Sequence, residues 1–299
     1  MRGIRIRLLW QLTNNMSGFF KNIGSNVREG MLSELVDWIC VHNMVTYKDK
    51  LMNNLILKDD LTLNYSHDKV VKITLRIDDK DEIPFPFKFG DDIDLSVTFN
   101  GVGFDKMKMW GKILPAKVVN IFICNMDIPE WSWLDGVEYL GSFHVNDSKI
   151  YDGFTGFLPK VNNMIEIFKC DIQNVNGFPH VSNSLYFNIA ECPNLKDISG
   201  LSDNNSKIGT VFIRKCNNIS EIGDLSGIII DSLYADSSFI ELAMNGCGKL
   251  FKEVNSKVFL YWDTKCSKDS FFKDYYDKAT IINKYICGMY PNVDFRIDL

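Results

Sequence analysis

The chain has 299 residues, a formal net charge of −5 at pH 7, 46% hydrophobic residues and 13% aromatic residues. This apolar content can form a continuous core and argues against general disorder. The acidic balance leaves no basic stripe to neutralise phosphates, so we do not expect a nucleic-acid partner. No run of about 18 uninterrupted apolar residues occurs, and the sequence therefore predicts no membrane-spanning helix.

The N-terminal part is predicted to be a helical cap that follows a short extension. Arginines alternate with apolar residues near the start and no small-residue cleavage site follows, so we do not expect a secretory signal. Residues 1–16 are predicted to be a disordered extension. Apolar side chains recur at helical spacing over 25–42, and a second, shorter helix is expected from Tyr47 to Leu57. Both precede the first clear repeat, which predicts a helical N-terminal cap over 17–68.

A pair of apolar residues in an x-apolar-x-apolar-x stretch returns throughout residues 69–265. The pairs are Leu75/Ile77, Val97/Phe99, Ile121/Ile123, Phe143/Val145, Ile165/Ile167, Phe187/Ile189, Val211/Ile213 and Leu233/Ala235. Their second members are separated by steps of 22, 24, 22, 22, 22, 24 and 22 residues. Such a period is typical of a solenoid, in which each unit buries its apolar face against its neighbours. We expect one short strand per repeat, paired in parallel with the next.

Two later repeats indicate how the chain returns between strands. Apolar residues stand at every third position in Asn194–Leu201 and again in Asn218–Leu225. This spacing suits a 3₁₀-like or irregular return. Gly177, Gly200 and Gly227 would permit the bends between units.

Residues 266–299 are predicted to form a C-terminal cap. Ser267–Ser270 offers N-capping side chains, and a helical pattern of aromatic and apolar residues follows. Gly288 would end that helix, and Val293–Ile297 resembles a last strand.

The segments Leu195-Lys-Asp-Ile198-Ser-Gly-Leu201 and Ile219-Ser-Glu-Ile222-Gly-Asp-Leu225 look like the return segment of leucine-rich repeat proteins. The chain resembles that family, in its 22-residue internalin-like class, over about two thirds of its length. Family members normally carry Asn where this chain has Lys80, Val102, Met126, Ser148, Cys170, Cys192, Cys216 and Ser238. Cys and Ser can partly replace the hydrogen bonds of this Asn, whereas Val and Met cannot. We therefore expect the first three repeats, which have neither Cys nor Ser there, to be irregular or flattened. The resemblance implies an α/β fold, a curved solenoid whose parallel strands line a concave, macromolecule-binding face.

The sequence indicates no catalytic, metal or cofactor site. It contains no phosphate-binding or dinucleotide-binding glycine motif, no HExxH and no GxSxG. Cys124 and His144 would stand on adjacent strands, which leaves a thiol–imidazole pair as one alternative. Cys170, Cys192 and Cys216 share one repeat position and are predicted to be free, buried and reduced, as in a cytoplasmic protein.

Residues that alternate with the core pairs point away from the core, and aromatic residues are frequent among them. We predict a partner-binding patch on this face, made of Phe122, His144, Phe168, Asn188, Phe212 and Tyr234. The alternative is that a cap or loop covers these side chains, or that isolated exposed aromatics carry no function.

The favoured interpretation is a non-catalytic, cytoplasmic module that binds a protein partner on its concave face. Ala is scarce while Asn, Lys and Ile are frequent, a bias typical of low-GC bacteria and their phages. A phage or bacterial factor that sequesters or inhibits a host protein fits these features. The alternatives are a translocated effector, or an enzyme whose repeats position a catalytic cap at residues 266–299.

Overall fold

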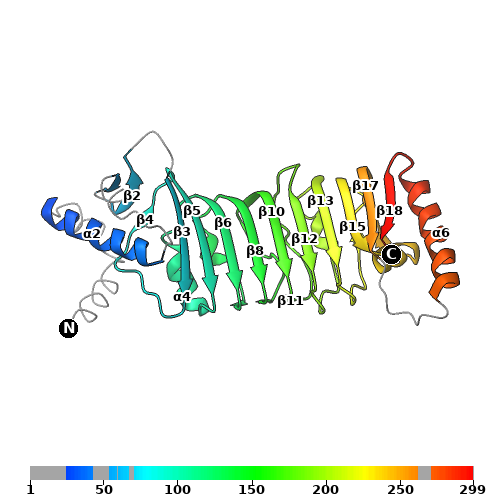
Figure 1. Cartoon of the computed structure of the whole chain (residues 1–299), viewed down its shortest axis with the longest axis horizontal. Coiled ribbons are helices and arrows are strands. Elements are labelled where there is room, and N and C mark those ends of the chain that lie inside the picture. The colour runs from blue at the N-terminus through cyan, green and yellow to red at the C-terminus, as the bar shows by residue number, and fades with distance from the viewer. Residues whose placement is uncertain (1–24, 43–53, 59, 67–70, 262–270, 299) are drawn as a thin grey trace.

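The computed structural model describes residues 25–42, 54–58, 60–66, 71–261 and 271–298. Ten parallel strands form one sheet in which spatial order follows chain order (Figure 1). They are β3 (Val71–Asp78), β5 (Ile93–Asn100), β6 (Lys117–Cys124), β8 (Tyr139–Asn146), β10 (Lys160–Phe168), β12 (Tyr186–Ala190), β13 (Lys207–Arg214), β15 (Ile229–Asp236), β17 (Glu253–Tyr261) and β18 (Asp294–Asp298). The protein therefore has an α/β fold built on a large parallel sheet.

The predicted apolar pairs form the core side of this sheet, and their register is confirmed. First members align with first members and second with second from β3 to β15. Every one of these side chains is at most 1% exposed. The sheet continues with two further pairs, Val258/Leu260 in β17 and Phe295/Ile297 in β18. One face of each strand is thus buried by alternation alone.

The connections between strands build a thinner second layer. Its two-residue strands β7 (Asp127–Ile128), β9 (Lys149–Ile150) and β11 (Asp171–Ile172) pair in parallel, as do β14 (Gly223–Asp224) and β16 (Gly248–Lys249). Two 3₁₀ helices are present in this layer, η3 (Ser132–Leu134) and η4 (Ser199–Ser202). The predicted 3₁₀-like or irregular return takes both forms: Asn194–Leu201 ends in η4, and Asn218–Leu225 is irregular and contains β14.

Glycines fit two of the predicted bends for different reasons. Gly177 has a φ of +68°, a left-handed conformation that other residues adopt at a cost. Gly200 has a neighbouring backbone in the place of a side chain, because a Cβ there would lie 2.3 Å from the carbonyl oxygen of Val175. Both glycines let successive connections pack closely.

In the described part of the chain, four helices accompany the sheet: α2 (Ser25–His42), α4 (Phe104–Gly111), α5 (Ser237–Met244) and α6 (Phe271–Met289). α2 lies at the β3 end of the molecule and α6 at the β18 end (Figure 1). The predicted helix over 25–42 is confirmed, and α6 continues through Gly288 rather than ending there. The predicted last strand is confirmed as β18.

The prediction of a second helix from Tyr47 to Leu57 is wrong for its last residues. Leu55–Leu57 forms strand β1, which pairs antiparallel with β2 (Thr62–Tyr65), and β2 pairs with β4 (Lys88–Phe89). Leu55 and Leu57 are buried while Ile56 between them is exposed, a strand period rather than a helical one. Residues 1–24, 43–53 and 262–270 lie outside the described residues, and with them the expected extension over 1–16.

Trp38 packs α2 against the start of the sheet. Its ring stacks on Trp110 with centroids 5.5 Å apart, and its indole N–H donates to the carbonyl oxygen of Glu82 at 2.9 Å. Leu35, Val36 and Ile39 are buried on the same side of the helix. α2 thereby covers apolar surface next to β3.

The expectation of irregular first repeats is wrong for their strands. β3, β5 and β6 each have eight residues and pair without a register shift. Other groups close the turns in which Asn is missing. The carboxylate of Asp81 accepts from the N–H of Asp78, and Gly101 with φ +63° donates to the carbonyl oxygen of Cys124 at 3.0 Å. Backbone and aspartate groups therefore replace the expected Asn.

A left-handed residue follows each of five successive strands, from β6 to β13. These residues are Asn125, Asp147, Lys169, Glu191 and Lys215, with φ between 47° and 55°. The first four donate their N–H to the carbonyl oxygen that ends the next strand, at 2.9–3.2 Å. Lys215 donates instead to the carboxylate of Asp236, where α5 begins. The same turn is thus built repeatedly at this edge, with non-glycine residues in a strained conformation.

Three thiols link neighbouring repeats just beyond these turns. Cys170, Cys192 and Cys216 are free and buried, as predicted. Each donates to the carbonyl oxygen two residues earlier at 3.4 Å and lies 3.3–3.8 Å from a carbonyl oxygen of the preceding strand. Ser148 takes this place in the preceding repeat and accepts from the N–H of Met126 at 3.1 Å. Cys and Ser here satisfy buried backbone groups.

Candidate functional site

The outward face of the sheet carries one residue of every strand in a single aligned row, which we call the central row. From β3 to β18 it reads Arg76, Thr98, Phe122, His144, Glu166, Asn188, Phe212, Tyr234, Phe259 and Arg296. Five of the six predicted partner-binding residues lie in it. The sixth, Phe168, lies one row closer to the strand ends, aligned with Asn146 and Ala190. The structure therefore brings all six to one face.

Aromatic rings gather on this face over β12 to β17. Phe212 and Tyr234 stack with centroids 4.1 Å apart and planes 3° from parallel. Tyr186 approaches Phe212 at 4.7 Å, and Phe259 lies 5.7 Å from Tyr234 and 5.0 Å from Tyr261. These five rings are the aromatic cluster. Aligned residues on parallel strands are about 4.8 Å apart, which is the spacing that lets rings stack.

Stacking decides what the aromatic cluster presents to a partner. All five side chains are half-buried, because each ring shields its neighbour. Rings stacked along the row cover each other's faces and leave their edges as free surface. A flat ligand such as a sugar needs free ring faces, whereas apolar side chains pack well on ring edges. The cluster therefore suits a protein surface better than a carbohydrate.

A polar network occupies the middle of the central row. The ring of His144 stacks on Phe122 at 4.3 Å and 9°, and its Nδ1 lies 3.1 Å from Oε2 of Glu166. The other carboxylate oxygen of Glu166 accepts from the side-chain amide of Asn188 at 2.9 Å. His144 is only 13% exposed at its side chain. These contacts hold four residues of neighbouring strands in fixed positions.

The alternative thiol–imidazole pair is not formed. Cys124 aligns with Asn146 on the next strand, while His144 aligns with Phe122 and contacts Glu166. Burial raises the pKa of Cys124, and the charge of Asp147 acts in the same direction. A nucleophilic thiol requires the opposite shift. The two side chains are on the same face but offset along it, because Cys124 is two residues, about 6.6 Å, further along its strand than Phe122.

Sequence reasoning missed several residues of this face. Phe259 and Tyr261 belong to β17, which begins after a longer connection and so falls outside the repeat interval. The alternating stretch Val258-Phe259-Leu260-Tyr261 was the available signal. Tyr186 is outward one position before the apolar pair, and Glu166 and Arg214 stand at outward positions that the prediction left out of the patch.

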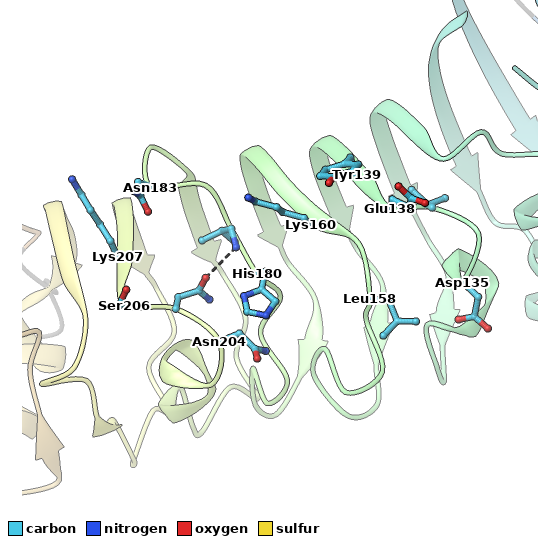
Figure 2. A pocket seen from close by; sticks show the side chains of 13 residues that line it. Asp135, Glu138, Tyr139, Leu158, Lys160, His180, Asn183, Asn204, Ser206 and Lys207 are labelled. Atoms are coloured by element: carbon cyan, nitrogen blue, oxygen red, sulfur yellow. Dashed lines mark hydrogen bonds between the residues drawn. The ribbon is translucent and has the colours of Figure 1, made fainter. Parts of the chain in front are cut away.

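A separate groove of about 590 Å³ lies at the opposite edge, where β8, β10 and β13 begin (Figure 2). Its charged lining is mixed, with Lys160 and Lys207 beside Asp135 and Glu138. Asn205 also lines the groove, but its side-chain oxygen already accepts an intramolecular hydrogen bond from the N–H of Val181 at 3.0 Å, the dashed line in Figure 2. The groove thus lies away from the predicted patch. The Asn205 side chain in it joins two successive connections of the chain.

Within the described ranges, no three His, Cys, Asp or Glu side chains are grouped to hold a metal ion. The helices in the same ranges are all too short or too polar to cross a membrane. Comparison with protein-family models, with curated proteins and with solved structures finds no match for this chain.

Proposed function

We propose that this chain is a non-catalytic protein-binding module that docks its partner on the outward face of the sheet. One observation carries the proposal: the central row aligns across ten strands and continues into the aromatic cluster. A sheet can fold with small polar residues on this face, as β3 to β8 do with Thr74, Ser96, Asn120 and Ser142. Aromatic side chains in such positions are typical of binding hot spots.

The proposed architecture is a leucine-rich-repeat-like solenoid with the sheet on its concave side and caps at 17–68 and 266–299. Support comes from the in-register strands, the repeated left-handed turn and the Ser and Cys side chains in the place of the family's Asn. A chain of repeats that contact only their neighbours exposes one long continuous face. Such a face fits an extended protein surface.

A catalytic role receives less support from the same residues. Both oxygens of Glu166 are engaged, one by His144 and one by Asn188. The pKa of Cys124 is raised rather than lowered. We place the protein in the cytoplasm, and the free state of the cysteines in the described part supports a reducing compartment.

The test is affinity capture from extracts of the native source with three forms of the protein. The first is wild type, the second carries Phe212→Ala and Tyr234→Ala, and the control carries Tyr151→Ala and Leu158→Ala. The control removes two apolar side chains that are 50% and 71% exposed and lie outside the central row.

We expect a stoichiometric protein partner with wild type and control but not with the Phe212/Tyr234 variant. Removing one central aromatic anchor costs about 2 kcal/mol or more of binding, roughly thirtyfold in affinity. Circular dichroism verifies that each variant is folded. Equal capture by all three folded forms would move the binding site away from this face.

A further inference from the structure

Arg214 is the one arginine embedded in the aromatic cluster among the described residues. Its guanidinium carbon lies 3.5 Å from the centroid of the Tyr261 ring, so the planar group is held flat against an aromatic face. Its Nε is buried and has no hydrogen-bond partner among the residues that the structure describes. The other N–H groups of the guanidinium form no hydrogen bond or ion pair with the described residues either, and these are the groups that an incoming acceptor can reach.

The carboxylates around Arg214 are all engaged by other groups. Glu166 accepts from Asn188 and contacts His144. Glu191 forms ion pairs with Lys215 at 2.7 Å and with Lys169 at 4.0 Å. Asp236, at the end of β15 next to the strand of Arg214, accepts from the N–H of Lys215. No ion pair is formed by Arg214 within the described ranges, although acidic side chains stand on neighbouring strands.

We propose that Arg214 binds the carboxylate of an Asp or Glu side chain in a protein partner, whose neighbouring apolar side chains pack on the aromatic cluster. The inference rests on the proposed function and adds the chemistry of the partner. A guanidinium presents N–H groups in a fixed fork that matches a carboxylate, and stacking on Tyr261 fixes its plane in advance. Specificity then comes from one acidic residue next to apolar ones.

The surroundings favour a single negative charge over a polyanion. Glu166, Glu191 and Asp236 lie near Arg214, and a string of phosphates would meet their repulsion, whereas one carboxylate needs only the guanidinium. Tyrosine hydroxyls add polar groups beside it. Burial first and then Glu166 raise the pKa of Tyr186, while Arg214 acts in the opposite direction, which places that hydroxyl within electrostatic reach.

The probe is a displayed library of random peptides of about a dozen residues, selected on the immobilised wild-type protein. We expect enriched peptides to carry Asp or Glu next to aromatic or aliphatic residues. Selected peptides are then synthesised with the acid intact and with the matching amide, and their affinities are measured for wild type, Arg214→Gln, Arg214→Lys and Lys215→Gln. Lys215 is the matched control, a 63% exposed cation one residue away.

We expect the acid-to-amide change in the peptide to weaken binding to wild type by at least about tenfold. The same change should have little effect on binding to Arg214→Gln, because the pair is then already broken. Arg214→Lys keeps the charge but loses the fork, and should bind with intermediate affinity. Lys215→Gln should behave as wild type. The peptide-side change cannot disturb the fold of the protein, so it stays informative if Arg214→Gln is unstable.

Five other outcomes would overturn the inference, and they separate it from the proposed function. Enriched peptides without an acid, or without coupling to Arg214, refute the carboxylate site; the binding face stands if Phe212→Ala with Tyr234→Ala still abolishes binding. Peptides that bind this double variant as well as wild type, or a selection that enriches nothing, contradict both proposals. Single-stranded DNA that binds through Arg214 would assign the residue to phosphate instead.

Discussion

Replacing Cys192 by Val and by Ser tests whether its thiol acts as a hydrogen-bonding group or as a small apolar side chain. Cys192 is fully buried and donates to the carbonyl oxygens of Ala190 at 3.4 Å and Ile167 at 3.8 Å. Val fills a similar volume but removes these bonds, whereas Ser keeps a donor and an acceptor.

The expected cost of Cys192→Val follows from the hydrogen bonds that the thiol donates. The carbonyl oxygens of Ala190 and Ile167 lose this donor, and a hydrogen bond within a folded protein contributes about 0.5–1.5 kcal/mol. Both oxygens keep their backbone hydrogen bonds in the sheet and sulfur is a weak donor, so the expected cost lies near the lower end of this range. We expect Cys192→Ser to lose less, because Ser148 already forms the same contacts one repeat from Cys170.

The measurement is equilibrium unfolding in urea under reducing conditions, followed by circular dichroism and by tryptophan fluorescence. Coincident transitions and equal slopes allow the free energies to be compared, a necessary check because long repeat arrays can lose cooperativity. The order expected is wild type above Ser above Val. A Val variant as stable as wild type, or more stable than Ser, would refute the hydrogen-bonding role and leave Cys192 as an apolar side chain.

Four further outcomes are expected. Ile167→Asp places an unpaired charge at a fully buried position and should cost about 4 kcal/mol or more, so a thermal midpoint equal to wild type would contradict the core assignment. Lys169→Gly should stabilise the chain by about 1 kcal/mol in urea unfolding, because φ is 54° there; destabilisation would show that the left-handed strain is small. Single and double Ala variants of Phe212 and Tyr234 should show a coupling of about 0.5–1.5 kcal/mol in unfolding, and additive effects would deny the stack a role in stability. Burial raises the pKa of Cys170 from 9.0 to about 11, so its contribution is fully present below pH 9 and is lost as pH rises through 11; a Cys170→Ser variant with the same alkaline loss of stability would refute this assignment.

The central strands could be predicted because one physical constraint acts on each of them alone. An apolar residue at every second position can only be buried from one side of a strand, and its return every 22 or 24 residues fixes which strands lie side by side. The alignment of Ile121, Phe143 and Ile165 follows directly from that spacing. Register errors would expose the whole apolar set, so the pattern is strongly specified.

The ends of the sheet could not be predicted in the same way. β17 and β18 contribute pairs as apolar as those before them, yet longer connections that include α5 and α6 delay them beyond the interval. The helix expected up to Leu57 is wrong at β1, because a three-residue strand has too short an alternation to distinguish from helical spacing. Local pattern determines the strand type, whereas connection length is set by packing that a single sequence does not display.

The candidate site was predictable in position but not in chemistry. Alternation alone placed Phe122, His144 and Tyr234 on the outward face. Which ring covers which neighbour depends on side-chain rotamers, and so does the engagement of Glu166 by two residues at once. The sequence placed Arg214 at an outward position but not its role, which depends on the ring beneath it and on the guanidinium having no hydrogen bond or ion pair with the described residues.

Stacking also sets how the proposed binding face must be tested, since a ring that stacks on its neighbour affects folding as well as any binding at the surface. A stacked pair contributes about 0.5–1.5 kcal/mol to stability, whereas a central binding anchor contributes about 2 kcal/mol or more to affinity. Loss of one ring such as Phe212 therefore leaves a folded majority in a protein of ordinary stability, while a partner would dissociate roughly thirtyfold more readily. Because the two effects differ in size and in readout, a variant that loses its partner while it stays folded can be assigned to the surface and not to the fold.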